Sequence, residues 1–191
     1  ASHKIAVYPL NHRDFCIKED ILEQIEKEKP GVIFLCNPNN PTGVLIPSLL
    51  LKKILQLCSR ENIRLFLDEC FLDFTGQEEQ LTLVGKLNQY PNLFILRAFT
   101  KMYAMAGVRL GFGITADTEV IEQMYQAGPP WNVSVLAGAS GKAALKEDCF
   151  VKETVRYIQK EKEYLYDILD TLKIQYRKST ANYILLKADT D

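Results

Sequence analysis

Three clusters of polar residues in this 191-residue chain combine side chains that can bind a cofactor and do chemistry. They occupy Cys36–Gly43, Leu67–Phe74 and Arg97–Gly113, and each follows or ends a short apolar run. An α/β sheet binds its ligands at the carboxyl ends of its strands. If the apolar runs are strands of one sheet, the three clusters are expected to face a single ligand.

The first cluster reads Cys-Asn-Pro-Asn-Asn-Pro-Thr-Gly. Asn, Pro and Gly together make turns, and most such clusters are only turns. At the end of a strand, however, an Asn amide can also donate a hydrogen bond to an anionic oxygen. The residues alone leave both interpretations open.

The second cluster places Asp68 at the end of an apolar run, with Glu69 next to it. An acid just past a strand is often simply solvated, or it caps the following turn. The alternative is that Asp68 pairs with a ring nitrogen and keeps that nitrogen protonated. Such a carboxylate would serve a heterocyclic cofactor that acts as an electron sink.

The third cluster contains Lys101. A lysine is usually a surface residue. Apart from Arg97, Thr100 and Arg109, however, residues 96–114 are nearly all apolar or small. Lys101 is therefore expected to be partly desolvated, with a lowered pKa and a nucleophilic amine. A hydroxyl such as Thr100 and a guanidinium such as Arg109 are suited to bind phosphate.

Short apolar runs alternate with amphipathic stretches, which predicts an α/β fold with a mostly parallel sheet and crossover helices. The predicted strands are Ile5–Tyr8, Val32–Cys36, Ile63–Leu67, Leu93–Leu96 and Leu110–Ile114. The predicted helices between them are Lys18–Lys27, Ser48–Glu61 and Thr82–Leu87.

The pattern changes after Ile114. Helices are predicted at Thr118–Tyr125, Val133–Leu145 and Asp148–Leu172, followed by short strands at Ile174–Tyr176 and Tyr183–Lys187. We expect residues 1–147 to belong to one large domain and 148–173 to form a connecting helix. Residues 174–191 would then begin a smaller α+β domain.

The composition excludes several classes of protein. A net charge of −1 and 47% hydrophobic residues are ordinary for a globular protein and indicate no nucleic-acid partner. No apolar run approaches the roughly 20 residues of a membrane span, so a cytoplasmic location without membrane contact is expected. Five widely spaced cysteines indicate neither a disulfide framework nor a zinc site, and two histidines near the start leave little for a Ser-His-Asp triad.

Together the three motifs resemble the fold-type I aminotransferase superfamily (class I/II), and the similarity extends over nearly the whole chain. The resemblance implies the cofactor pyridoxal 5'-phosphate (PLP), with residues 1–147 as part of the PLP-binding large domain. It implies that Lys101 holds PLP as a Schiff base and that Asp68 pairs with the pyridine nitrogen. It also implies that Asn40 bonds the phenolic oxygen, and that Thr100 and Arg109 bind the phosphate.

One position departs from the common pattern of the family. Phe71 stands where most aminotransferases have a tyrosine that also bonds the phenolic oxygen. Asp68–Phe74 and Pro130–Ser134 resemble threonine-phosphate decarboxylases, a branch of the histidinol-phosphate aminotransferase group that makes aminopropanol phosphate for cobalamin. Within the second segment, Trp131 is equally explained as a core or hinge aromatic.

The resemblance therefore implies decarboxylation of L-threonine phosphate, with a histidinol-phosphate or other class I/II aminotransferase as the alternative. The small-molecule partner would be a phosphorylated amino acid or an amino donor. A noncatalytic PLP-fold binding module is a second alternative.

The resemblance also bears on the extent of the chain. Members of the family are longer at both ends and are usually homodimers. The chain is thus expected to be a segment that, alone, binds PLP weakly and turns over little. The aromatic that stacks on the cofactor and the arginine that grips the substrate carboxylate would lie outside it.

Overall fold

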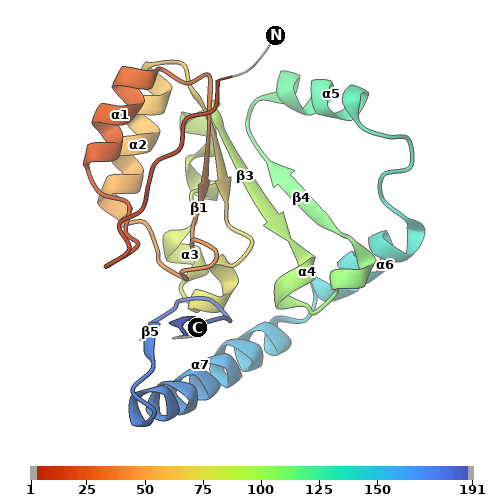
Figure 1. The fold of residues 1–191 in the computed structure, drawn as a ribbon. Coiled ribbons are helices and arrows are strands. Elements are labelled where there is room, and N and C mark those ends of the chain that lie inside the picture. The colour runs from red at the N-terminus through yellow and green to blue at the C-terminus, as the bar shows by residue number, and fades with distance from the viewer. Residues whose placement is uncertain (1–3, 189–191) are drawn as a thin grey trace.

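The computed structural model describes residues 4–188, which are built around a four-stranded sheet (Figure 1). Its strands are β1 (Val32–Cys36), β2 (Arg64–Asp68), β3 (Leu93–Ala98) and β4 (Gly111–Ile114), and they lie side by side in chain order. The first three strands are parallel, whereas β4 is antiparallel to β3. The predicted α/β class with a mostly parallel sheet is confirmed.

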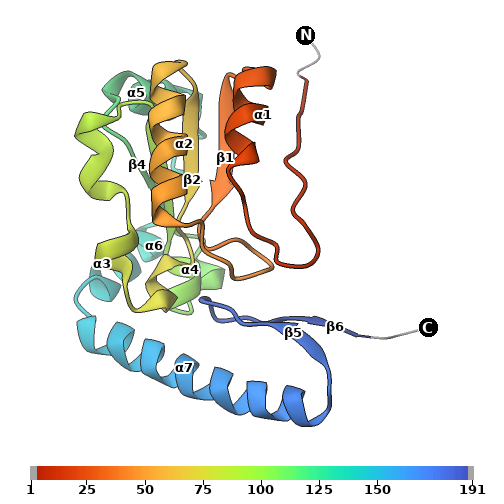
Figure 2. The ribbon, with the colours of Figure 1, turned by 90° about the vertical axis from the view of Figure 1, so that its left-hand side faces the viewer.

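Two helices cover one face of the sheet, α1 (Asp20–Glu28) and α2 (Ser48–Arg60) (Figure 2). Alternate strand residues point toward them, and Leu65, Leu67 and Ile95 are completely buried there. From α2, Ile54 and Leu55 complete this core. Burial of these aliphatic side chains fixes the strand register, because a slip by one residue would turn every one of them outward.

The opposite face of the sheet carries a ladder of aromatic rings. Phe34, Phe66 and Phe94 are register partners on β1, β2 and β3, and successive ring centroids lie 4.8 and 4.9 Å apart. Phe34 remains 70% exposed. We call these three residues the aromatic face.

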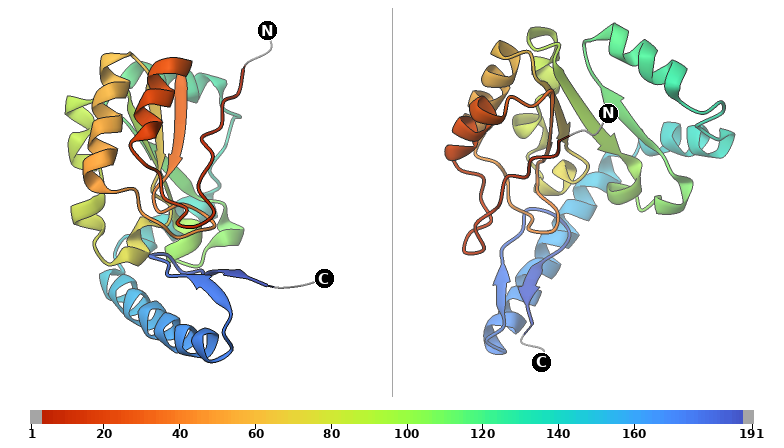
Figure 3. Two further views of the ribbon diagram at one scale, coloured as in Figure 1. Left: turned by 60° about the vertical axis from the view of Figure 1, so that its left-hand side comes forward. Right: turned by 45° about the horizontal axis from the view of Figure 1, so that its top comes forward.

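The last part of the chain lies beneath the carboxyl ends of the three parallel strands. The long helix α7 (Asp148–Thr171) runs there, with the antiparallel pair β5 (Gln175–Arg177) and β6 (Leu185–Lys187) beside it (Figure 3). The remaining elements are α3 (Glu78–Leu81), α4 (Phe99–Met102), α5 (Thr118–Ala127), α6 (Val135–Ala144) and three 3-10 turns, η1 (Leu72–Thr75), η2 (Val84–Gln89) and η3 (Ala106–Val108).

Two predicted elements are wrong. Residues 5–8 form no strand; Ile5 and Val7 are 85% and 74% exposed, so their apolar side chains do not contribute to a core. The helix expected at 82–87 is the 3-10 turn η2, because Glu69 binds the Thr82 hydroxyl and the Leu83 amide and so fixes the entry of the chain.

Within residues 4–188, no helix has the length and apolarity required to cross a membrane. In the same part of the chain, no group of three or more His, Cys, Asp or Glu side chains is arranged to hold a metal ion.

Candidate active site

A pocket of about 420 Å³ lies where the carboxyl ends of the strands meet the segment that leads into β6. Asn40, from the loop after β1, and Lys101, from α4 after β3, both line it. Phe71 lies between them in sequence, and the Lys101 Nζ is 5.3 Å from the centroid of its ring. The rest of the lining is Pro41, Asn182, Tyr183, Ile184 and Leu185.

Lys101 is exposed, so the expected desolvation of its amine is not found in this structure. The reason lies in α4, which is a single helical turn. Phe99 and Met102 are only 7% and 2% exposed, and residues three apart share one helix face. Since those two anchor α4 to the protein, Lys101 is turned to the open side and faces the pocket.

Asp68 ends β2 and is half-buried, and its Oδ1 accepts a hydrogen bond from the Cys70 amide at 2.9 Å. Burial, followed by the hydrogen bond and charge of Asp68, raises the pKa of the Cys70 thiol to about 12. Burial and the charges of Cys36 and Asp68 likewise raise the pKa of Tyr183 to about 12. Tyr183 lines the pocket, whereas Asp68 itself does not belong to the pocket lining.

The loop that carries Asn40 is fastened to the segment before β6. The Tyr183 hydroxyl donates to the Asn39 carbonyl at 2.9 Å, and the Thr180 hydroxyl donates to the Gly43 carbonyl at 2.8 Å. Gly43 has a φ of +67°, a conformation suited to glycine. Asn40 is itself exposed and free to face a ligand in the pocket.

The two predicted phosphate ligands do not reach this pocket. Within residues 4–188, Thr100 is half-buried and Arg109 is exposed, and neither belongs to the pocket lining. Arg109 donates from Nη1 to the Ala106 carbonyl at 3.1 Å. Trp131 is 95% exposed and is also outside the lining.

The sequence alone does not indicate Tyr183 as a pocket residue. It lies in a predicted strand, and no local pattern indicates that its hydroxyl contacts Asn39, 144 positions earlier. The roles of Glu69 and Arg97 are likewise not predicted from the sequence. One signal does point to them, since Glu69 directly follows the apolar strand β2 and Arg97 is a charged residue within β3.

Comparisons with known proteins identify the family. Residues 1–188 match the family model described as aminotransferase class I and II. The chain is 35% identical over 160 residues to a threonine-phosphate decarboxylase from Salmonella typhimurium, covering 83% of this chain and 43% of that protein. It is also 35% identical over 175 residues to histidinol-phosphate aminotransferase 1 from Carboxydothermus hydrogenoformans, covering 91% and 48%.

The solved structures agree with the family match. The histidinol-phosphate aminotransferase from Clostridium acetobutylicum superposes with a TM-score of 0.87 at 29% identity, covering 95% of this chain and 54% of that one. The chain thus spans about half the length of the relatives it matches.

The side chains around the pocket fit PLP, the cofactor of this family. Lys101 offers an amine to its aldehyde, and Asn40 offers an amide donor to its phenolic oxygen. Asp68 places a carboxylate at the end of the neighbouring strand β2, outside the lining of the pocket. The chain belongs to the class I and II aminotransferases, and its cofactor is pyridoxal phosphate.

Proposed function

We propose that the protein is a PLP enzyme that acts on a phosphorylated amino acid and decarboxylates L-threonine phosphate to aminopropanol phosphate. The observation that carries this proposal is the pocket shared by Asn40, Phe71 and Lys101. The similarity to a threonine-phosphate decarboxylase supports the substrate class. Formation of aminopropanol phosphate would place the enzyme in cobalamin biosynthesis.

Each site residue has a distinct task in this proposal. PLP, when bound, supplies an electron sink for the bond that breaks at the substrate α-carbon. Lys101 would hold the cofactor through its Nζ and later carry a proton on that atom. Asp68 would keep the pyridine nitrogen protonated, and Asn40 would donate to the phenolic oxygen. Thr100 and Arg109 remain the proposed phosphate ligands by resemblance.

Phe71 favours the decarboxylase over the aminotransferase. Its ring meets Tyr183 edge-on at 5.0 Å and presents no hydroxyl to the pocket. The second candidate is a histidinol-phosphate aminotransferase, because the identity to that relative is equally high. The two reactions differ in which group on the α-carbon is held perpendicular to the cofactor ring, the carboxylate or the hydrogen.

Two incubations of the full-length protein separate these candidates. Release of carbon dioxide from L-threonine phosphate, without any oxo acid added, supports the decarboxylase. Formation of glutamate from histidinol phosphate and 2-oxoglutarate supports the aminotransferase. The proposal is wrong if glutamate forms and carbon dioxide does not.

Replacement of Lys101 tests whether the protein is instead a noncatalytic binding module. We expect the wild-type protein to show an absorbance band of lysine-bound PLP, and Lys101→Ala to lose both the band and the turnover. The Lys142→Ala variant is the control, because Lys142 is exposed on α6. A band that persists in Lys101→Ala assigns the attachment to another amine.

The division of the chain and its assembly are also proposals. We propose that residues 1–147 belong to the PLP-binding large domain, that 148–173 connect, and that 174–191 begin the small domain. A cytoplasmic homodimer is proposed from the resemblance to the family. Sedimentation of the full-length protein tests the dimer.

A further inference from the structure

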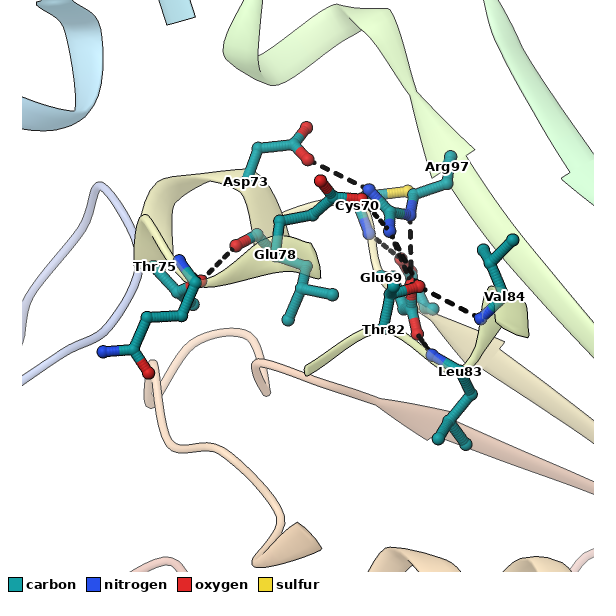
Figure 4. Close-up of polar contacts among 12 residues, drawn as sticks. Glu69, Cys70, Asp73, Thr75, Glu78, Thr82, Leu83, Val84 and Arg97 are labelled. Carbon is teal, nitrogen blue, oxygen red and sulfur yellow. Dashed lines mark hydrogen bonds and ion pairs between the residues drawn. The ribbon is translucent and has the colours of Figure 1, made fainter. Parts of the chain in front are cut away.

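A buried ion-pair network joins β3 to the loop after β2 (Figure 4). Arg97 donates from Nη2 and from Nε to the same Glu69 oxygen, at 2.8 and 3.1 Å. The Glu69 side chain is 0% exposed and that of Arg97 is 10% exposed. A charge buried this deeply is tolerated only when a partner offsets its desolvation, so each residue requires the other.

Two more carboxylates approach the same guanidinium. Arg97 Nη1 donates to Asp73 at 2.9 Å, and Nη2 donates to Glu78 at 2.9 Å. Burial raises the pKa of Asp73 although the charge of Arg97 opposes the rise. Burial lowers the pKa of Arg97, but the surrounding carboxylates outweigh it and raise the pKa overall. Arg97 is therefore a permanently charged centre. Its planar guanidinium donates to three carboxylates and, at 3.1 Å, to the Thr82 hydroxyl.

Glu69 is attached to its surroundings by further bonds. Its carboxylate accepts from the Leu83 amide at 3.1 Å and from the Thr82 hydroxyl at 2.8 Å. Its own amide donates to the Leu96 carbonyl of β3 at 2.9 Å. Backbone and side chain of Glu69 thus both connect the end of β2 to β3.

The location of this connection relates it to the site. Glu69 directly follows Asp68, and Arg97 lies in β3, which leads straight into α4 with Lys101. The pair therefore joins the segment that carries Asp68 to the segment that carries Lys101. Replacing a buried ion pair with apolar side chains of similar volume is often neutral for stability, so stability alone does not account for the pair.

We propose that Arg97 is a positioning residue, which through Glu69 sets the place of Asp68 relative to Lys101. The inference rests on the proposed function, because those two residues would hold opposite edges of PLP. A shift of either segment would weaken the contact of Asp68 with the ring nitrogen while Lys101 stays attached.

The test replaces both members of the pair in the full-length protein, Arg97→Met with Glu69→Met, so that the fully buried charge of Glu69 is not left unpaired. Asp73 and Glu78 also lose Arg97, but their side chains are 24% and 39% exposed and stay in contact with solvent. Three quantities are measured: the PLP dissociation constant by fluorescence, the pH midpoint of the bound-cofactor absorbance band, and the unfolding temperature without PLP. We expect an unfolding temperature near that of the wild type. The dissociation constant should rise about tenfold, as for loss of one charged hydrogen bond.

The pH midpoint of the bound-cofactor absorbance band distinguishes a positioning role from a purely structural one, because loss of stability alone would not change it. A ring nitrogen that is held less firmly protonated withdraws less charge, so the midpoint should move upward by about one unit. Arg97→Lys keeps the positive charge but loses the planar set of donors. It should raise both the PLP dissociation constant and the pH midpoint, by less than the double variant does. The matched control is Arg64→Met, since Arg64 pairs with Asp117 at 2.7 Å at the far end of β2 and should leave both values unchanged.

The outcomes separate the two proposals. A wild-type protein without a PLP band overturns the proposed function itself. If the wild type binds PLP and the double variant keeps both its affinity and its midpoint, the positioning role is wrong while the function stands. If the double variant does not fold, Arg97→Lys decides, and unchanged values in that variant overturn the role of Arg97.

Discussion

Phe71 places an aromatic ring beside the amine of Lys101 in this pocket. The Nζ lies 5.3 Å from the centroid of the Phe71 ring, within the range of a cation–π contact. An aromatic face attracts an ammonium group, but it donates no hydrogen bond to a ligand oxygen. The Tyr183 hydroxyl does not compensate, because it is bound to the Asn39 carbonyl.

Phe71→Tyr should restore a donor to the phenolic oxygen of PLP. A hydrogen bond to the charged form of that oxygen favours it, so the pH midpoint of the cofactor band should fall, by up to about one unit. A pH titration of absorbance in the full-length protein measures this. Phe71→Leu is the control, since it changes the ring without adding a donor. Equal midpoints in all three proteins would show that residue 71 does not contact that oxygen.

At the scale of elements, Gly43 joins the loop of Asn40 to the segment before β6. A Cβ at this position would come within 1.9 Å of the Ser179 Oγ, and its φ of +67° disfavours other residues. We expect Gly43→Ala to lower the free energy of unfolding by about 1–3 kcal/mol and to weaken PLP binding. Denaturant titration and PLP titration of the full-length protein measure the two effects.

Gly85→Ala is the matched control for Gly43→Ala. A Cβ at Gly85 meets nothing within 4 Å, so the free energy of unfolding should change by less than about 0.5 kcal/mol. Equal losses in the two variants would contradict the close fit of Gly43 against Ser179.

Asp117 begins α5 as its N-cap, and it also accepts a bond from Arg64 at 2.7 Å. The bond from Arg64, followed by the backbone bond from Val120, lowers the pKa of Asp117. A lowered pKa stabilises the folded state above the unfolded value of about 3.9, and this stabilisation is lost as the pH falls through the folded value.

Asp117→Asn should therefore lower the unfolding temperature at pH 7, and the difference from the wild type should shrink below about pH 3. Thermal unfolding at both pH values tests it. Glu153→Gln, an exposed carboxylate on α7, serves as the control. A difference that is independent of pH would mean that the charge of Asp117 contributes nothing.

The sequence predicts elements well where periodicity reflects a buried face. α2 and α7 begin at the predicted residues, Ser48 and Asp148, and β1 has the predicted bounds. The prediction fails where a side chain distant in sequence determines the local conformation. Glu69, for example, binds the residues that lead into η2. The prediction also fails at Ile5–Tyr8, where an apolar run has no partner strand within residues 4–188.

At the scale of the whole molecule, the aromatic face is covered at Phe94, which is 3% exposed, and open at Phe34, which is 70% exposed. Exposed apolar surface of this kind drives association. We expect the 191-residue chain, taken alone, to self-associate with rising concentration. Phe34→Ser should reduce this most, because the exposed Phe34 ring lies on the edge strand β1 and is stacked on Phe66 of the aromatic face. Light scattering against concentration measures it. Tyr125→Ser, which alters a side chain that is 82% exposed on α5, is the control, and an equal effect of both would contradict a role for the aromatic face.

Part of the candidate site could be predicted from the sequence, because the fold brings the ends of its parallel strands together. Asn40, Asp68 and Lys101 follow strands of one sheet, so local motifs and the α/β rule suffice to bring them to one edge. Tyr183 and the pair of Glu69 with Arg97 depend on contacts between distant segments, which no local motif encodes.

The contact between Tyr183 and Asn39 spans 144 positions. A ribosome that adds about 5–20 residues per second needs roughly 7–30 s to travel that distance. During this interval the loop of Asn40 is already made, but the residues that fasten it do not yet exist. The contact is therefore made only after residue 183 is translated, and cofactor loading is expected to follow that point rather than accompany translation of the sheet.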